Sequence, residues 1–127
     1  MTKGNYVDGF VLVISKKNVA SYKKMAAEAA IVWKKFGALD YKECMGDDMK
    51  PNMGGQPGLT FPKMTKAKSN ETVWFSYIAY KNKKHRDAVN KKVMDYFNKK
   101  YAKKEHQDMP FDMKKMAYGG FSVIVSQ

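Results

Sequence analysis

Carboxylates and a thiol lie together near the middle of the chain. Glu43 and Cys44 shortly precede the acidic pair Asp47 and Asp48. Paired carboxylates can exchange protons with a substrate or bind a hard cation, and a thiolate beside a basic group can act as a nucleophile. Adjacent aspartates are also common turn formers, and nothing in the sequence places a histidine near Cys44. We therefore expect no metal and no other cofactor, and we favour an inert thiol at Cys44.

A histidine, an arginine and an aspartate follow one another at His85, Arg86 and Asp87, and Asn90 comes shortly after them. The pattern resembles the catalytic loop of protein kinases, but the asparagine comes too early and no glycine-rich loop precedes it. Two interpretations are left. The three side chains could form part of a functional site where a helix begins, or Asp87 could stabilise that helix end and pair with Arg86. The second interpretation is favoured.

Asp8 is unusual because it interrupts an otherwise apolar stretch, Tyr6–Ile14, beside Gly9. A carboxylate inside a fold must be paired, neutralised or hydrated. Asp8 could therefore be a base with a shifted pKa, or a structural group that accepts hydrogen bonds near the rim of the sheet. Trp33, Trp74 and Tyr77 could likewise line a ligand pocket or fill a core, and the core interpretation is favoured for them.

The elements that must position these residues follow the order strand, helix, strand, which occurs twice. Residues 6–15 and 71–80 are apolar on both alternating faces, which predicts central strands covered on both sides. Apolar residues at three- and four-residue spacing predict helices over residues 18–36 and 84–99. Two further strands are predicted, a half-polar edge strand over residues 38–46 and a last strand over residues 115–125.

A long segment, residues 47–70, joins the two halves of the chain. It is rich in glycine, proline, lysine and asparagine, and it is too long for a tight hairpin. It could be a lid, an arm that binds a partner or a flexible spacer, and we favour a spacer for residues 49–58. Residues 59–62 could add a short edge segment.

The element order predicts a single α+β domain over residues 1–127, a ferredoxin-like βαββαβ sandwich. In this fold an antiparallel four-stranded sheet carries two helices on one face, so the other face is left uncovered. An apolar face of this size is normally covered, and a second copy of the chain would do so, giving a homodimeric α+β barrel. We expect the uncovered face to carry part of an apolar set: Tyr6, Phe10, Trp74, Phe75, Tyr77, Ile78, Phe121 and Ile124.

The composition restricts the setting in which the protein works. No apolar run approaches the ~20 residues that cross a bilayer, and the first residues lead into a strand without an apolar secretion segment. Cys44 is the only cysteine, which excludes a disulfide within the chain. We therefore expect a cytoplasmic protein that does not bind a membrane.

The net charge of +12 raises nucleic acid as a partner. The basic residues are concentrated in segment 81–104, which could form a module that binds nucleic acid or an acidic partner. The third strand, however, reads Val73-Trp74-Phe75-Ser76-Tyr77, without the glycine and flanking charge of an RNA-recognition motif. The lysines also fall on the helical side, away from the sheet face that RNA would use. We favour a solvated surface and keep nucleic-acid binding as the alternative.

One set of residues resembles a known family over nearly the whole chain. The matching stretches are Tyr6–Val11, Trp33–Leu39 with Tyr41, Glu43 and Cys44, Gly46–Asp48, Phe75–Tyr77, Tyr80–Lys81, His85–Asn90, Met109–Asp112 and Gly119–Phe121. They resemble the bacterial YbaA-like family, catalogued as domain of unknown function 1428. The resemblance implies a ferredoxin-like fold of the dimeric α+β-barrel superfamily and no established reaction. The chain departs from the family in its lysine content and in extra residues around Met53–Gly58.

These observations lead to one hypothesis and one alternative. The hypothesis is a small cytoplasmic homodimer whose pocket, between sheet and helices, binds or transforms a small organic molecule without a metal. Whether it catalyses a reaction is left open. The candidate pocket residues are Asp8, Trp33, Glu43, Cys44, Tyr77, His85, Arg86 and Asp87. The alternative is the nucleic-acid or acidic-partner module of residues 81–104.

Overall fold

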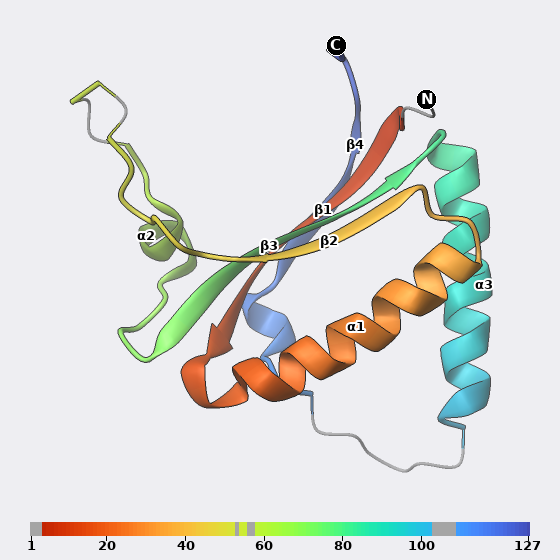
Figure 1. Cartoon of the computed structure of the whole chain (residues 1–127), viewed down its shortest axis with the longest axis horizontal. Coiled ribbons are helices and arrows are strands. Elements are labelled where there is room, and N and C mark those ends of the chain that lie inside the picture. Colours follow the sequence, from red (N-terminus) through yellow and green to blue (C-terminus); the bar gives the residue numbers. More distant parts are fainter. Residues whose placement is uncertain (1–3, 53, 56–57, 103–108) are drawn as a thin grey trace.

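The computed structural model describes residues 4–52, 54–55, 58–102 and 109–127. Strand, helix and strand follow one another twice, as the sequence predicts (Figure 1). The strands and α-helices are β1 (Tyr6–Ser15), α1 (Val19–Lys35), β2 (Asp40–Met45), α2 (Phe61–Thr65), β3 (Glu71–Tyr80), α3 (Lys83–Lys100) and β4 (Ala117–Ser122). Single turns of 3₁₀-helix, Lys16–Asn18 and Met113–Lys115, precede α1 and β4. No helix in the described part of the chain has the length and apolar character needed to cross a membrane.

The four strands form one antiparallel sheet in the order β2-β3-β1-β4. The two strands predicted to be central, β1 and β3, are central. The prediction of an α+β protein with a four-stranded antiparallel sheet is therefore confirmed. In the register, Phe10 lies opposite Ser76 on β3 and Tyr118 on β4, and Glu43 on β2 lies opposite Ser76. These residues share one face of the sheet because directly opposed residues point to the same side.

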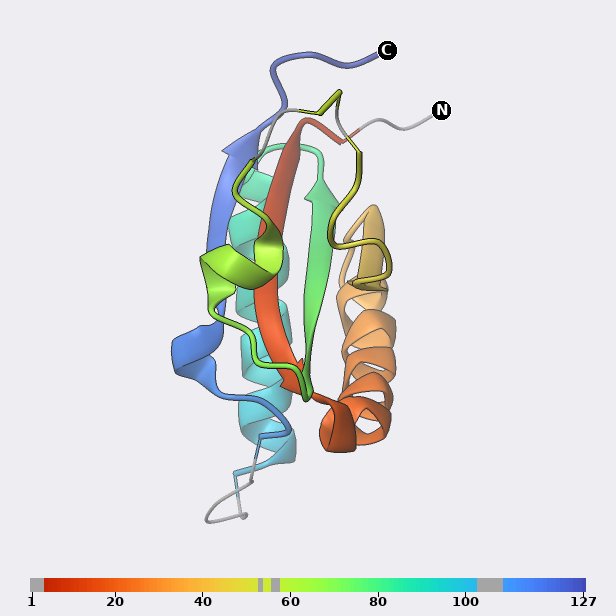
Figure 2. The ribbon, with the colours of Figure 1, turned by 90° about the vertical axis from the view of Figure 1, so that its left-hand side faces the viewer.

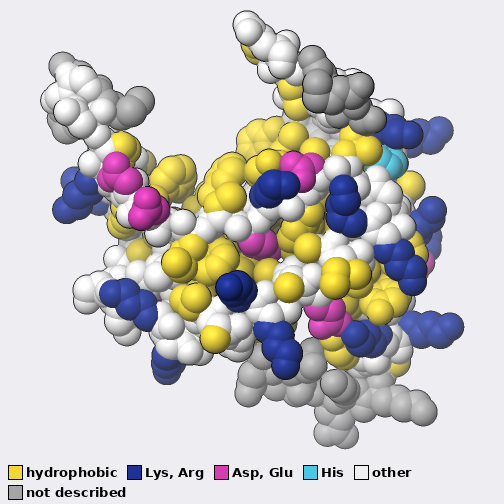
Figure 3. Space-filling model, in the orientation of Figure 1, with side chains coloured by type: hydrophobic (Ala, Val, Ile, Leu, Met, Phe, Trp, Pro, Cys, Tyr) yellow, Lys and Arg dark blue, Asp and Glu magenta, His cyan; other side chains and the backbone are white. Residues whose placement is uncertain are grey.

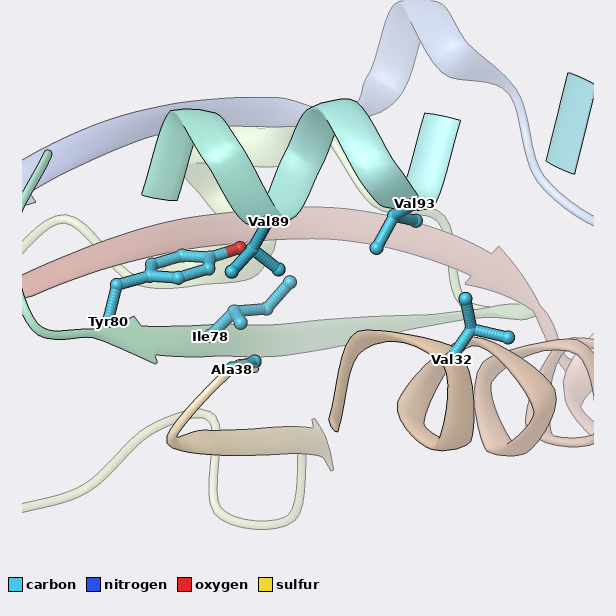
Figure 4. Packing of buried hydrophobic residues seen from close by; sticks show 6 residues of the cluster. All are labelled: Val32, Ala38, Ile78, Tyr80, Val89 and Val93. Carbon is cyan, nitrogen blue, oxygen red and sulfur yellow. The ribbon is translucent and has the colours of Figure 1, made fainter. Parts of the chain in front are cut away.

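Helices α1 and α3 cover one face of the sheet, while α2 lies on the other side of the strands (Figure 1, Figure 2). The core between sheet and helices has two clusters. Figure 4 shows the first cluster, in which the Tyr80 ring packs beside Val89 of α3 and Ile78 of β3. The second consists of Leu12, Ile14, Tyr22, Ala26 and Trp74. One alternating set of residues of β1 and β3 supplies both clusters, because successive side chains of a strand point to opposite faces.

Local signals set the ends of the two long helices. The side chain of Asn82 accepts a hydrogen bond from the backbone N–H of His85 at 2.8 Å, which caps the start of α3. Gly37 follows α1 with a φ of +116°, a conformation that side chains rarely adopt. The chain can therefore turn directly from α1 into β2.

The structure differs from the prediction in segment 47–70 and in the last strand. Residues 59–62, expected to add an edge segment, instead lead into α2, because Thr60 caps a helical turn that begins with Phe61 and Pro62. Met53, Gln56 and Pro57 of the expected spacer lie outside the described residues. β4 ends at Ser122, since its partner there is Tyr6, the first residue of β1.

The face of the sheet away from α1 and α3, called here the outer face, is partly apolar. Part of the apolar set was expected on it, and of that set Tyr6, Phe10, Trp74 and Ile78 lie on the helix-covered face, where they pack with the core clusters. Phe75 and Phe121 lie on the outer face and are 47% and 61% exposed. Figure 3 shows hydrophobic side chains gathered between the projecting segment that follows β2 and the end of the chain.

Candidate functional site

A cavity of about 300 Å³ lies between the sheet and α1. Its volume is at the lower end of the ~300–1,000 Å³ typical of ligand pockets. The small side chains Ala26 and Ala29 of α1 leave room above the strands, and Phe97 of α3 closes one side. Met109, Phe111 and Met116, which precede β4, complete the lining. We call this space the Glu43 cavity, because Glu43 is the one charged group among its described lining residues.

Three hydroxyl groups hold the carboxylate of Glu43. Tyr22 Oη donates to Glu43 Oε1 at 2.8 Å and Tyr41 Oη donates to Glu43 Oε2 at 2.6 Å. Ser76 Oγ also donates to Oε1. Alternation along β2 puts Tyr41 and Glu43 on the same face, the register brings in Ser76, and α1 supplies Tyr22. A polar cluster thus forms at the wall of an otherwise apolar space.

Burial shapes the protonation of this cluster. Burial raises the pKa of Tyr22 and of Tyr41 far above their usual range, and the charge of Glu43 acts in the same direction. Both phenols therefore stay protonated and remain donors to the carboxylate. Within the described part of the chain, no basic side chain forms an ion pair with Glu43. Among the described residues, its partners are these three hydroxyl dipoles.

A second polar cluster surrounds Asp8 on the same face of the sheet. Arg86 Nη1 lies 2.6 Å from Asp8 Oδ1, and the exposed fractions of the two side chains are 19% and 8%. The guanidinium also contacts Asp87 at 2.8 Å and lies over the Tyr6 ring, 5.0 Å from its centre. Burial lowers the pKa of Arg86, but the hydrogen bond to Asp87 and the charge of Asp8 outweigh it and raise the pKa overall. Asp8 is thus paired inside the fold.

The Asp8–Arg86 pair borders a second cavity, of about 320 Å³, between α3 and β4. Trp33 and Phe10 line this cavity and the Glu43 cavity alike, so they form part of the wall between the two. The indole N–H of Trp33 is fixed by hydrogen bonds to Tyr80 Oη and Asn90 Oδ1, both at 3.1 Å. Burial raises the pKa of Tyr80, and the charge of Asp8 contributes to the rise. These two hydrogen bonds therefore hold the Trp33 ring, and with it this part of the wall, in place.

The eight candidate residues do not form one site. Trp33 and Glu43 line the first cavity, and Asp8, Trp33 and Arg86 line the second. Asp87 is exposed and paired with Arg86, in agreement with the favoured interpretation. His85 accepts a hydrogen bond from the Lys81 N–H at its Nδ1, so this nitrogen is engaged in fixing the start of α3.

Cys44 and Tyr77 lie on the outer face, away from both cavities. Adjacent residues of a strand point to opposite sides, so Cys44 is exposed on the outer face while Glu43 points to the helices. Tyr77 Oη donates to Asp40 Oδ2 at 3.1 Å on that outer side. Asp48 accepts a hydrogen bond from the Lys50 N–H, which is the turn-forming role expected of it. Among the described residues, no three His, Cys, Asp or Glu side chains gather as metal ligands would.

Sequence reasoning missed Tyr22, Tyr41 and Ser76 as members of the polar cluster. Two signals were available. Tyr41 and Glu43 are two residues apart on a strand and must share a face, and Ser76 is the polar exception at an inward position of an apolar strand. The spacing of Tyr22 is that of an apolar residue of the first helix, and nothing in the sequence shows that its hydroxyl reaches β2.

The lysines of α3 are spread around the helix. Lys83, Lys91 and Lys99 are each followed by a second exposed lysine. Eight-residue spacing turns the direction by about 80° each time, so the first and last pairs point about 160° apart. Lys91 is also paired with Asp95 at 2.9 Å. The lysines therefore form no single stripe along the helix. Lys103 and Lys104 of the predicted basic segment lie outside the described residues.

A family model described as "Protein of unknown function (DUF1428)" matches residues 5–113. The chain belongs to this DUF1428 family. It is 40% identical over 122 residues to the uncharacterised protein YbaA of Escherichia coli strain K12, and the match covers 96% of this chain and 98% of the relative. The uncharacterised YbaA proteins of Escherichia coli O157:H7 and Shigella flexneri match at the same identity and coverage.

The part of the chain matched to the DUF1428 family contains most of both polar clusters. Residues 5–113 include Glu43 with its three hydroxyl donors, and Asp8 with Arg86. β4 and Met116, which complete the second and first cavities, lie after that part. The resemblance noted from the sequence is thus confirmed at the level of the family, whose function is unknown.

Proposed function

We propose that this DUF1428 protein is a cytoplasmic bacterial homodimer with a ferredoxin-like fold that binds a small organic molecule in the Glu43 cavity. The observation that carries the proposal is an apolar space of about 300 Å³ with one polar cluster in its wall. Ligand sites are typically apolar spaces with a few precisely placed polar groups. Three donors fix the carboxylate of Glu43 before any ligand arrives. This favours binding, because the Glu43 side chain then loses little conformational freedom when the ligand binds.

We infer that a ligand reaches the cavity between α1 and β2. A surface groove of about 500 Å³ lies there, lined on α1 by Ala27, Ala30 and Lys23. Tyr41 and Glu43 line both the groove and the cavity. The polar cluster therefore stands between solvent and the interior, where a ligand that enters through the groove meets Glu43 first.

The homodimer is supported by the shape and composition of the outer face. Phe75 and Phe121 are largely exposed there, and exposed apolar patches of this kind mark contact surfaces. The segment after β2 projects at one end of this face and the chain end at the other, which leaves a hollow between them (Figure 1, Figure 3). Two sheets that pack face to face lie about 10 Å apart. The sheet of a second copy can pack against this hollow in the same way.

Ligand binding is tested by filling the cavity from α1. Ala29→Met places a larger side chain in the cavity, and Ala20→Met makes the same change at an exposed position of the same helix. In a thermal-shift screen with small amines, alcohols and carboxylic acids, at least one class should raise the melting temperature of the unaltered chain and of Ala20→Met. The shift should be absent in Ala29→Met. No shift with any class, or an equal shift in Ala29→Met, would contradict the proposal.

The homodimer is tested with charges on two exposed surfaces. Phe75→Lys places a charge on the outer face, and Ile31→Lys places one on α1, where Ile31 is 71% exposed. Sedimentation should give about twice the 14.5 kDa of one chain for the unaltered protein and for Ile31→Lys. Phe75→Lys should sediment as a folded monomer. A mass of 14.5 kDa for the unaltered chain would rule the homodimer out.

A further inference from the structure

We propose that the ligand of the Glu43 cavity is an organic cation, an amine with an apolar body whose ammonium group pairs with Glu43. This inference rests on the proposed function, because it names the class of molecule that the cavity binds. Three features lead to it: the contacts of the carboxylate, the charges around it and the aromatic walls.

The contacts of Glu43 leave room for one more donor. A carboxylate offers about four acceptor positions. Tyr22 and Ser76 both donate to Oε1, whereas Tyr41 alone donates to Oε2. All three neighbours are neutral hydroxyls, so they orient the carboxylate without cancelling its charge. A ligand ammonium can donate to the open position on Oε2 and supply the missing positive charge.

The basic side chains that the structure describes beside Glu43 line the groove rather than the cavity. Among the described residues that line the cavity, none is basic. Lys23 and Lys42 line the groove on the solvent side, and Lys42 lies 2.6 Å from Asp40, its ion-pair partner. Among the described lining residues, Glu43 is therefore the one charged group of the cavity.

The walls of the cavity also suit a cation. Tyr22, Trp33, Tyr41 and Phe97 line it, and the ring centres of Trp33 lie 6.0 Å from Tyr41 and 6.3 Å from Phe97. Faces of aromatic rings carry negative potential and attract ammonium groups, most strongly where water is excluded. A ligand anion would meet both these faces and Glu43. A neutral ligand would cover the half-buried Glu43 without giving it a counter-ion.

The inference is tested with three probes of matched size: 3-phenylpropylamine, 3-phenylpropan-1-ol and 3-phenylpropanoate. Calorimetric titration of the full chain at one pH and one salt concentration should show the amine binding roughly tenfold tighter than the alcohol, since the charge pair forms in an apolar space. The carboxylate should bind weakest of the three. This comparison needs no altered protein, so it does not depend on the folding of a variant.

Two variants assign the preference to Glu43. Glu43→Gln keeps an oxygen acceptor but removes the charge, so the amine and the alcohol should bind with similar affinity. Asp48→Asn removes the same charge from an exposed turn and should leave the roughly tenfold preference unchanged. A preference that persists in Glu43→Gln, or that is lost equally in Asp48→Asn, would overturn the inference.

The outcomes separate this inference from the proposed function. If the alcohol or the carboxylate binds as tightly as the amine, and Ala29→Met blocks that binding, the cation inference fails while the cavity remains the binding site. If the amine binds equally well to Ala29→Met, the amine lies elsewhere on the protein and the cation inference fails. If no probe binds, the cation inference fails, and the broader screen with Ala29→Met then decides the proposed function.

Discussion

Two carboxylates lie on the same face of one sheet, and the fold treats them differently. Asp8 has an arginine at 2.6 Å, so its counter-ion is built into the chain. Glu43 has three hydroxyl donors and no ion-pair partner among the described residues. Removing one partner of a buried pair leaves a charge stranded, whereas hydroxyls around a carboxylate leave the charge available. This difference supports our proposal that Glu43 takes part in binding, whereas Asp8 serves the stability of the fold.

The largest loss of stability should come from breaking the ion pair between Asp8 and Arg86. Arg86→Met leaves Asp8 buried without a counter-ion and should lower the free energy of unfolding by about 3 kcal/mol. Glu43→Gln keeps a hydrogen-bonded amide in place and should cost about 1 kcal/mol. Urea unfolding of both variants measures the difference. Equal losses would mean that the two carboxylates play the same role.

A second substitution disturbs the packing of the side chains around Asp8 and Arg86. A Cβ added at Gly120 would overlap the Tyr6 hydroxyl, so Gly120→Ala must move the ring that lies against Arg86. Such overpacking costs about 1–3 kcal/mol. Gly119→Ala is the matched control, because its nearest neighbour atom would be 3.8 Å away. Thermal unfolding should separate the two variants, and similar melting temperatures would contradict the packing described here.

The hydroxyl groups around Glu43 should make the free energy of unfolding depend on pH in the alkaline range. Because burial raises the pKa of Tyr41, the folded chain keeps a proton that the unfolded chain loses near pH 10. The stabilisation is thus complete below about pH 10 and falls by about 1.4 kcal/mol per pH unit above it. Tyr41→Phe should reduce this slope by that amount and leave the slope between pH 7 and 9 unchanged. Urea unfolding across this range checks it, and an unaltered slope above pH 10 would be the contrary result.

The smallest effect is expected on the outer face. Cys44 is adjacent to Glu43 in sequence but lies on the other side of the sheet. Cys44→Ser should therefore leave ligand affinity within about twofold, which corresponds to ~0.4 kcal/mol. Calorimetric titration with the amine probe measures it, and a larger loss would place the ligand on the wrong face.

The sequence predicts the strands and helices of this protein better than it predicts the side-chain clusters around Glu43 and Asp8. Apolar runs on both parities identify β1 and β3 as central, and Asn82 marks the start of α3, because these signals are local in the chain. The Glu43 cluster joins residues of α1, β2 and β3 that are far apart in sequence, so only the register and the helix packing bring them together. The same holds for the pairing of Asp8 with Arg86, which are 78 residues apart.

The expected outer face shows the same limit. Alternation along β1 separates two sets of residues, but it does not say which set meets the helices. From the sequence alone, Tyr6 and Phe10 fit either face of the sheet equally well. The pairing with β3 and the packing of α1 show that they lie on the helix-covered face. The helix α2 was missed because Thr60 and Pro62 act as start signals over a single turn, which is too short for an apolar periodicity to appear.

A bound organic cation is proposed to neutralise the charge of Glu43. A crystal structure of the protein with 3-phenylpropylamine is the decisive test. We expect the amine nitrogen within hydrogen-bonding distance of Glu43 Oε2 and the phenyl ring in contact with the apolar lining of the cavity. An amine bound beside Asp8 and Arg86, or with its nitrogen pointing away from Glu43, would contradict it.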